Sequence, residues 1–176
     1  YDAYIKNKKI NKKFQFSLIK PIKHNKKIKI YLEDANKLVK KIKADVMYVD
    51  PPYNSRQYSR FYHVLENLTK WEKPKLFGVA MKPEPENMSD YCRNTAYEKF
   101  RDLIENMNAE HIIVSYNNTY NSKSSSSENK ITLDQIREVL SKKGKISEES
   151  KSYNHFNAGK TSFVDHKEFI FYTKVR

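Results

Sequence analysis

Residues 46–53 read VMYVDPPY, a short apolar run that ends in an acid, two prolines and a tyrosine. Four consecutive apolar residues followed by prolines are typical of a buried strand, because the run is too short for a helix. Each proline fixes φ and removes one backbone donor. The stretch therefore predicts a core strand over residues 46–49 that leaves the sheet through a stiff turn.

The polar groups of this turn indicate what it could bind. In open α/β sheets, ligands bind at the carboxyl ends of strands, which is where the turn lies. Because the backbone around it is stiff, we expect the Asp50 carboxylate and the Pro51 carbonyl to be held as two acceptors facing one spot. Two fixed acceptors suit a neutral amine.

Outward from the turn, strands alternate with helices. Helical spacing of apolar residues is found in residues 35–42, 61–71, 96–107 and 132–140, and patterns typical of strands in residues 29–32, 111–116 and 168–173. Ser89 and Thr132 are placed to begin helices, and Gly144 stands where a helix would end. The order predicts an α/β fold with a mostly parallel sheet.

Two segments next to these elements carry further expectations. In the segment after the turn, Trp71, Tyr58, Tyr62 and His63 are predicted to pack in the core rather than contact a ligand. Residues 117–130 are polar and low in complexity, which predicts an exposed loop.

The charge of the chain is +13 and is concentrated at its start. Residues 1–43 hold fourteen lysines against three acids. Such a surface attracts phosphate-rich partners, since neutralised phosphates release their counterions. A solvated lysine-rich face explains the charge equally well.

The remaining composition excludes several classes of protein. Cys92 is the only cysteine, so the chain can form neither an internal disulfide nor a cysteine-based zinc site, and no metal site is predicted. No apolar stretch approaches the length of a membrane span, and no signal peptide is visible. We expect a soluble, cytoplasmic protein.

Longer stretches then identify a family. IYLEDANKLV, ADVMYVDPPYNSRQYSRFYHVLENLTKW, YCRNTAYEKFRDLI and IIVSYNN follow one another from residue 28 onward. With these stretches the chain resembles the Dam-like (DPPY) adenine-specific DNA methyltransferases, in their C-terminal catalytic part. The resemblance implies part of a Rossmann-like, S-adenosylmethionine-dependent methyltransferase sheet with flanking helices. It also implies methylation of the exocyclic amine of a flipped adenine in double-stranded DNA, within a restriction-modification system.

The resemblance assigns roles to the turn. Asp50 and the Pro51 carbonyl would bond the hydrogens of the amine, Pro52 would complete the rigid turn, and Tyr53 would stack on the flipped base. Positioning and fixed dipoles would then supply most of the rate acceleration, without a metal.

Other residues receive roles by the same resemblance. Asp34 would contact the adenosine part of the cofactor, with Glu33 as the alternative contact, although Asp34 is equally well placed to cap the helix over residues 35–42. The nucleic-acid contacts would come from Asn54, Arg56, Arg60 and Lys160, where solvated loop side chains are the competing interpretation. Ser115, Tyr116 and Asn117 either form a wall of the base pocket or simply end a buried strand.

The domain organisation departs from the family pattern. Residues 28–176 are expected to form the catalytic domain, and the basic residues 1–27 the end of a target-recognition region. The three glycines form no glycine-rich cofactor loop, so the domain is expected to be incomplete. We expect the loop to lie in an N-terminal part that precedes Tyr1 or on a second chain.

Two alternatives keep other functions open. The same chemistry could act on the exocyclic amine of cytosine or on RNA, although the acid at position 50 favours adenine, because relatives that methylate cytosine usually carry serine there. A non-catalytic DNA-binding module with the same fold is the other alternative.

Overall fold

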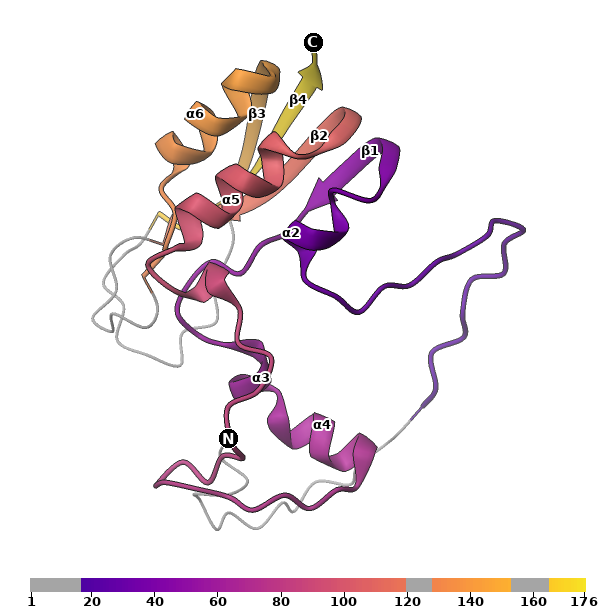
Figure 1. The fold of residues 1–176 in the computed structure, drawn as a ribbon, viewed down its shortest axis with the longest axis vertical. Helices are drawn as coiled ribbons and strands as arrows, with labels where there is room; N and C mark the ends of the chain where they lie inside the picture. Colours follow the sequence, from indigo (N-terminus) through magenta and orange to yellow (C-terminus); the bar gives the residue numbers. More distant parts are fainter. Residues whose placement is uncertain (1–16, 120–127, 153–164) are drawn as a thin grey trace.

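The computed structural model describes residues 17–119, 128–152 and 165–176. Figure 1 shows its helices and strands. In chain order they are α2 (Ala35–Leu38), β1 (Lys43–Val49), α3 (Tyr58–Phe61), α4 (His63–Lys70), the 3-10 helix η1 (Asp90–Cys92), α5 (Ala96–Glu105), β2 (Asn108–Asn117), α6 (Leu133–Lys143), β3 (Gly144–Ser152) and β4 (Lys167–Val175).

The strands form one mixed sheet in the order β1-β2-β4-β3. β1 and β2 are parallel, whereas β4 runs antiparallel to both β2 and β3. The α/β class is confirmed, but the expected mostly parallel sheet is wrong for the described strands. The error has two sources: the polar strand β3 was not predicted, and the direction of a strand cannot be read from its own sequence.

One face of the sheet forms the core. Alternate residues of each strand point to the same face, and register brings Met47 and Ile112, and Val49 and Val114, side by side. All four are buried. α5 and α6 lie over this face (Figure 1). The predicted apolar stripe is confirmed, since Ala96, Phe100, Leu103 and Ile104 of α5 are buried, as is Met107 just after the helix.

The opposite face of the sheet is exposed in the described part of the chain. Val46 is 52% exposed and Tyr48 is 61% exposed, and Ile170 and Tyr172 of β4 are partly exposed as well. β1 is also an edge strand, because β2 is its only partner among the described strands. An apolar face and an open strand edge therefore meet at β1.

The connection from α6 to β3 explains one glycine. Thr132 caps α6 in a reciprocal capping box with Gln135, as predicted for its start. Gly144 follows the helix directly, and its φ of 174° is extended rather than left-handed. A Cβ at Gly144 would lie 1.9 Å from the carbonyl oxygen of Lys174. The glycine is needed because β3 and β4 approach each other closely, and not for helix termination alone.

Two local predictions are corrected. Residues 29–32 form no strand and are exposed, because no described segment pairs with them and a lone strand leaves its backbone groups unpaired. Ser89 does act as a cap, but of η1: its hydroxyl accepts from the Tyr91 amide at 3.2 Å, and α5 begins only after Thr95.

The expected packing of the segment after the turn is also largely wrong. His63 is buried, but Trp71 is 64% exposed, and Tyr58 and Tyr62 are exposed too. α3 and α4 project away from the sheet (Figure 1), and Leu65 and Leu68 of α4 are exposed among the described residues. Helical spacing identified the helix correctly but could not tell what lies against it.

None of the helices in the described ranges combines the length and the apolarity that a membrane crossing requires.

Candidate active site

The Asp50 carboxylate is anchored on one of its two oxygens. Oδ1 accepts from the Ser115 hydroxyl at 2.9 Å and from the Tyr53 hydroxyl at 3.1 Å. The Tyr48 hydroxyl donates in turn to Ser115 Oγ at 2.9 Å. Within the described ranges, no group donates to Asp50 Oδ2 or to the Pro51 carbonyl. The turn thus presents two acceptors beside one fixed oxygen.

Buried contacts also pin the backbone of the turn. The Tyr53 carbonyl accepts from the Lys130 amide at 2.8 Å and from the Tyr116 hydroxyl at 3.1 Å. The same hydroxyl accepts from the Ile131 amide at 3.2 Å. The rings of Tyr53 and Tyr116 meet edge to face with centroids 5.0 Å apart. Tyr116 therefore ties the turn to β2 and to the segment that leads into α6.

A second carboxyl group reaches the turn from β4. The Tyr53 hydroxyl lies 2.7 Å from Glu168 Oε1. Burial, reinforced by the negative charge of Asp50, raises the pKa of Glu168, although the hydrogen bond from Tyr53 opposes the shift. Burial and then the bond to Glu168 raise the pKa of Tyr53, so the phenol keeps its proton.

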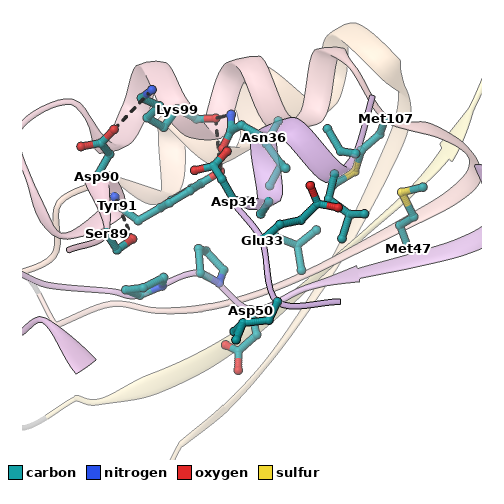
Figure 2. Close-up of a pocket in the computed structure, with 18 of the residues that line it drawn as sticks. Glu33, Asp34, Asn36, Met47, Asp50, Ser89, Asp90, Tyr91, Lys99 and Met107 are labelled. Carbon is teal, nitrogen blue, oxygen red and sulfur yellow. Dashed lines mark hydrogen bonds and ion pairs between the residues drawn. The ribbon is translucent and has the colours of Figure 1, made fainter. Parts of the chain in front are cut away.

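The turn forms one side of a cavity of about 850 Å³. Asp50, Pro51 and Pro52 line it together with Glu33 and Asp34. In Figure 2, Asp34 lies across the cavity from Asp50. The Asp50 carboxylate points away from the cavity. Apolar side chains of α2, β1 and α5 form much of the remaining wall, including Leu38, Val39, Met47 and Leu103. Asp50 and the pair Glu33 and Asp34, which were predicted separately from the sequence, thus border one cavity.

Both acids at the far side of the cavity also have structural contacts. Asp34 caps α2, accepting from the Lys37 amide at 3.0 Å, which confirms the capping interpretation of this residue. Glu33 forms an ion pair with Lys41 at 2.7 Å. Asp34 and Glu33 are exposed and line the cavity, so these contacts leave room for a ligand.

A buried network holds α2 in place beside the cavity. Asn36 donates to the Lys99 carbonyl at 2.8 Å and to Asp102 at 2.7 Å, and accepts from the Tyr91 hydroxyl at 2.9 Å. Figure 2 shows Asn36, Tyr91 and Lys99 of this network on the same side of the cavity as Asp34. The hydrogen bond from Asn36 lowers the pKa of Asp102. The network fixes the start of α2 against α5, and with it the position of Asp34.

The side-chain amide of Gln57 fixes the part of the cavity wall that contains Ser89. Gln57 is buried; its Nε2 donates to the Ser89 carbonyl at 2.8 Å, and its Oε1 accepts from the Ser89 amide at 2.7 Å. Gln57 thereby pairs with the backbone of Ser89 as a neighbouring strand would, and Ser89 lines the cavity. The segment after the turn is thus tied to the loop before η1.

Sequence reasoning missed Glu168, Asn36 and Gln57. Glu168 had a readable signal, because it is an acid at the start of the otherwise apolar run over residues 169–172. Asn36 and Gln57 had none, since each is a common surface residue in sequence and becomes buried only through partners more than thirty residues away.

The residues predicted to contact nucleic acid differ in how far contacts within the chain engage them. Asn54 accepts from the Arg56 amide at 3.0 Å, which makes a local turn, and the exposed Arg56 follows it. The Arg60 guanidinium donates to the Pro83 carbonyl, so part of it is engaged within the chain. Lys160 lies outside the described residues.

The three residues at the end of β2 have different positions. Ser115 bonds Asp50, so it belongs to the site, whereas Tyr116 is fully buried beneath the turn. Asn117 is buried, and its side chain accepts from the Thr119 amide at 3.2 Å. Of the three, only Ser115 touches the Asp50 carboxylate. Neither at this site nor elsewhere in the described ranges is a group of three or more His, Cys, Asp or Glu side chains arranged to hold a metal ion.

Comparisons with known proteins show which proteins the chain is similar to. Modification methylase StsI of Streptococcus sanguinis is 50% identical over 97 residues, which are 54% of this chain and 15% of that protein. Type II methyltransferase M.FokI of Planomicrobium okeanokoites is 38% identical over 118 residues, or 66% of this chain and 17% of that protein. Type II methyltransferase M.NlaIII of Neisseria lactamica is 33% identical over 78% of this chain and 39% of its own length.

The chain spans less than a fifth of StsI and of M.FokI. No solved structure matches it. A sequence model of the D12 class N6 adenine-specific DNA methyltransferases matches residues 1–120, which include β1 and the whole DPPY turn. The chain therefore belongs to the D12 class N6 adenine-specific DNA methyltransferase family.

Proposed function

We propose that the protein transfers a methyl group from S-adenosylmethionine to the exocyclic amine of adenine in double-stranded DNA. The observation that carries the proposal is the pair of acceptors at the DPPY turn, Asp50 Oδ2 and the Pro51 carbonyl, beside a cavity. The names of the relatives, modification methylase and type II methyltransferase, support a place in a restriction-modification system.

The chemistry follows from the two acceptors. The lone pair of the adenine amine is delocalised into the ring, which makes the amine a weak nucleophile. Asp50 and the Pro51 carbonyl would each accept one of its hydrogens and so favour the pyramidal form, in which the lone pair is available. Ser115 and Tyr53 fix Asp50 Oδ1 beforehand, so the carboxylate needs little reorganisation during the reaction.

Tyr53 has a further proposed role at the base. An amine inside the duplex stack is out of reach, so the adenine must be turned out of the helix. Stacking on an aromatic ring contributes about 1–3 kcal/mol per base. Tyr116 and Glu168 hold the Tyr53 ring, which lowers the entropy lost when a base stacks on it.

The cavity supplies part of a site for the methyl donor. Bound S-adenosylmethionine would provide the electrophilic methyl group. Carboxylates such as Asp34 and Glu33 can accept from ribose hydroxyls and the adenosine amine, and the apolar wall suits an adenine ring. The described residues around the cavity offer no glycine-rich turn of backbone N–H groups.

We propose that another part of the protein, preceding this segment or on a second chain, carries that glycine-rich loop. The open edge of β1 and the exposed face around Tyr48 would accept a further strand and its covering elements. Residues 28–176 would then complete a catalytic domain in the cytoplasm. The lysines of residues 1–27, with Asn54, Arg56, Arg60 and Lys160, would bind DNA phosphates.

The test is methyl transfer by the full-length protein with Asp50→Ala. We expect kcat for labelled-methyl transfer to adenine in duplex DNA to fall about 100-fold or more, the range for a lost preorganised polar group, with DNA binding largely kept. Asp45→Ala is the matched control, since Asp45 is an exposed acid on the same strand. Unchanged transfer by Asp50→Ala refutes the mechanism, and DNA binding without transfer by the unaltered protein identifies a non-catalytic module.

A further inference from the structure

The Tyr53 hydroxyl lies between two carboxyl groups that come from different strands. It is 3.1 Å from Asp50 Oδ1, at the end of β1, and 2.7 Å from Glu168 Oε1, at the start of β4. The antiparallel register explains the meeting, because Glu168 pairs with Asn117, the last residue of β2. The sheet topology thus brings an acid 115 residues away in sequence to the DPPY turn.

This acid is not an ordinary surface carboxylate. Within the described residues its side chain forms a hydrogen bond only with Tyr53, and it is partly buried. Burial and the charge of Asp50 raise the pKa of Glu168. Removing a carboxyl from water beside another acid is unfavourable, and acids perturbed in this way occur most often at functional sites. Sheet packing alone offers no reason for an acid at this position.

Glu168 affects the position of the Asp50 carboxylate through the Tyr53 hydroxyl, which contacts both acids. The Tyr53 hydroxyl has a single proton, so it donates to Asp50 Oδ1 when Glu168 carries a proton and donates in turn to the Tyr53 oxygen. Glu168, at the shorter distance, sets where the Tyr53 oxygen lies. The ring of Tyr53 also packs edge to face against Tyr116, which restricts its rotation. Glu168 then sets the remaining freedom of the hydroxyl position.

We propose that Glu168 is a positioning residue for methyl transfer, acting through the Tyr53 hydroxyl to fix the Asp50 carboxylate. The inference rests on the proposed function, because it assigns Glu168 a part in the same reaction. Glu168 does not contact the amine. It acts on the rate by keeping Asp50 Oδ1 engaged, so that Oδ2 faces the substrate.

The test is a double-mutant cycle in the full-length protein with Glu168→Ala and Tyr53→Phe. Each single variant is expected to lower kcat about 10-fold or more with little change in KM for DNA, since ring stacking is kept in Tyr53→Phe. Adding Glu168→Ala to Tyr53→Phe should cause no further loss, because the hydroxyl through which Glu168 acts is already absent. Multiplying losses, or full activity of Glu168→Ala, would overturn the proposal.

Two further variants separate positioning from folding. Glu168→Gln keeps a donor, its side-chain amide N–H, for the Tyr53 oxygen and should recover kcat to within about threefold of the unaltered protein. A loss as large as that of Glu168→Ala rejects the hydrogen bond as the cause. Glu149→Ala removes an exposed acid from the adjacent strand β3 and should leave kcat unchanged. A kcat loss of the same size in Glu149→Ala would show that the effect is a general one of sheet charge.

A readout without activity keeps the inference separate from the proposed function. With tyrosine labelled with carbon-13 at Cζ, the Tyr53 resonance is assigned by its disappearance in Tyr53→Phe. This resonance should move in Glu168→Ala and stay in place in Glu149→Ala. If the unaltered protein transfers no methyl group, the proposed function fails, while an unmoved Tyr53 resonance in Glu168→Ala refutes the contact itself.

Discussion

The Tyr116 hydroxyl provides a test of how the DPPY turn is held. Tyr116 and Ile131 are both fully buried, and the hydroxyl both accepts from the Ile131 amide and donates to the Tyr53 carbonyl. Tyr116→Phe removes one oxygen and leaves the ring in place. The Tyr53 carbonyl keeps its bond from the Lys130 amide, so it remains satisfied. The Ile131 amide loses its partner in a region without access to water.

The magnitude follows from this asymmetry. A buried donor left without a partner costs about 1–3 kcal/mol. With a urea m-value of about 2 kcal/mol/M, typical of a domain of this size, the midpoint should fall by roughly 0.5–1.5 M. The assay is urea unfolding followed by far-ultraviolet circular dichroism, with the m-value checked for each variant.

The matched control is Tyr97→Phe. The Tyr97 hydroxyl donates to Glu138 at 3.1 Å at an exposed position, where water can replace the bond. Its loss should cost less than about 0.5 kcal/mol. If Tyr116→Phe unfolds at the same midpoint as the unaltered protein, or if Tyr97→Phe costs as much, then the buried bonds do not hold the turn as described.

Two further predictions concern residues of strand β3. Gly144→Ala should lower stability by about 1–3 kcal/mol or more, since the new Cβ meets the Lys174 carbonyl oxygen at 1.9 Å. Gly78→Ala, at φ +69° in open space, should cost only about 1–2 kcal/mol of backbone strain. Equal urea midpoints for Gly144→Ala and the unaltered protein would contradict the close approach. The hydrogen bond from Arg137 lowers the pKa of Glu148, so its stabilisation is present above the ordinary glutamate pKa and is lost as pH falls through the lowered value. The small stability deficit of Glu148→Gln, under about 1 kcal/mol for a surface pair, should therefore shrink in acid, and a deficit that is constant with pH would exclude the ion pair as its origin.

Local patterns predicted those features whose physical cause is local. The strand before the DPPY turn, the buried stripe of α5 and the Thr132 cap depend on residues within a few positions of one another, and all three are confirmed. Strand β3 was missed, because only Ile146 in its run of nine residues carries a large apolar side chain. Its partner β4 was found, but its antiparallel direction depends on pairings that no local pattern records.

The same distinction between local and long-range causes applies to the residues of the candidate site. The sequence predicted Asp50, Tyr53 and Asp34 as site residues, because an acid next to prolines or before a helix has a recognisable setting. It could not place Glu168, whose proposed role depends on a contact with Tyr53, 115 residues away in sequence. Asn36 was equally invisible, since its three bonds all go to residues on η1 and α5.

The errors on the exposed side of the molecule share one cause. Tyr48, Leu32 and Trp71 are apolar residues that sequence patterns assign to an interior, and all three are exposed among the described residues. By contrast, every bond that fixes the Asp50 carboxylate comes from the described sheet or from the turn itself. The carboxylate that we propose as an acceptor for the amine is thus held by contacts within the described residues. The glycine-rich loop that we propose would complete donor binding, and it would have no need to reshape the acceptors.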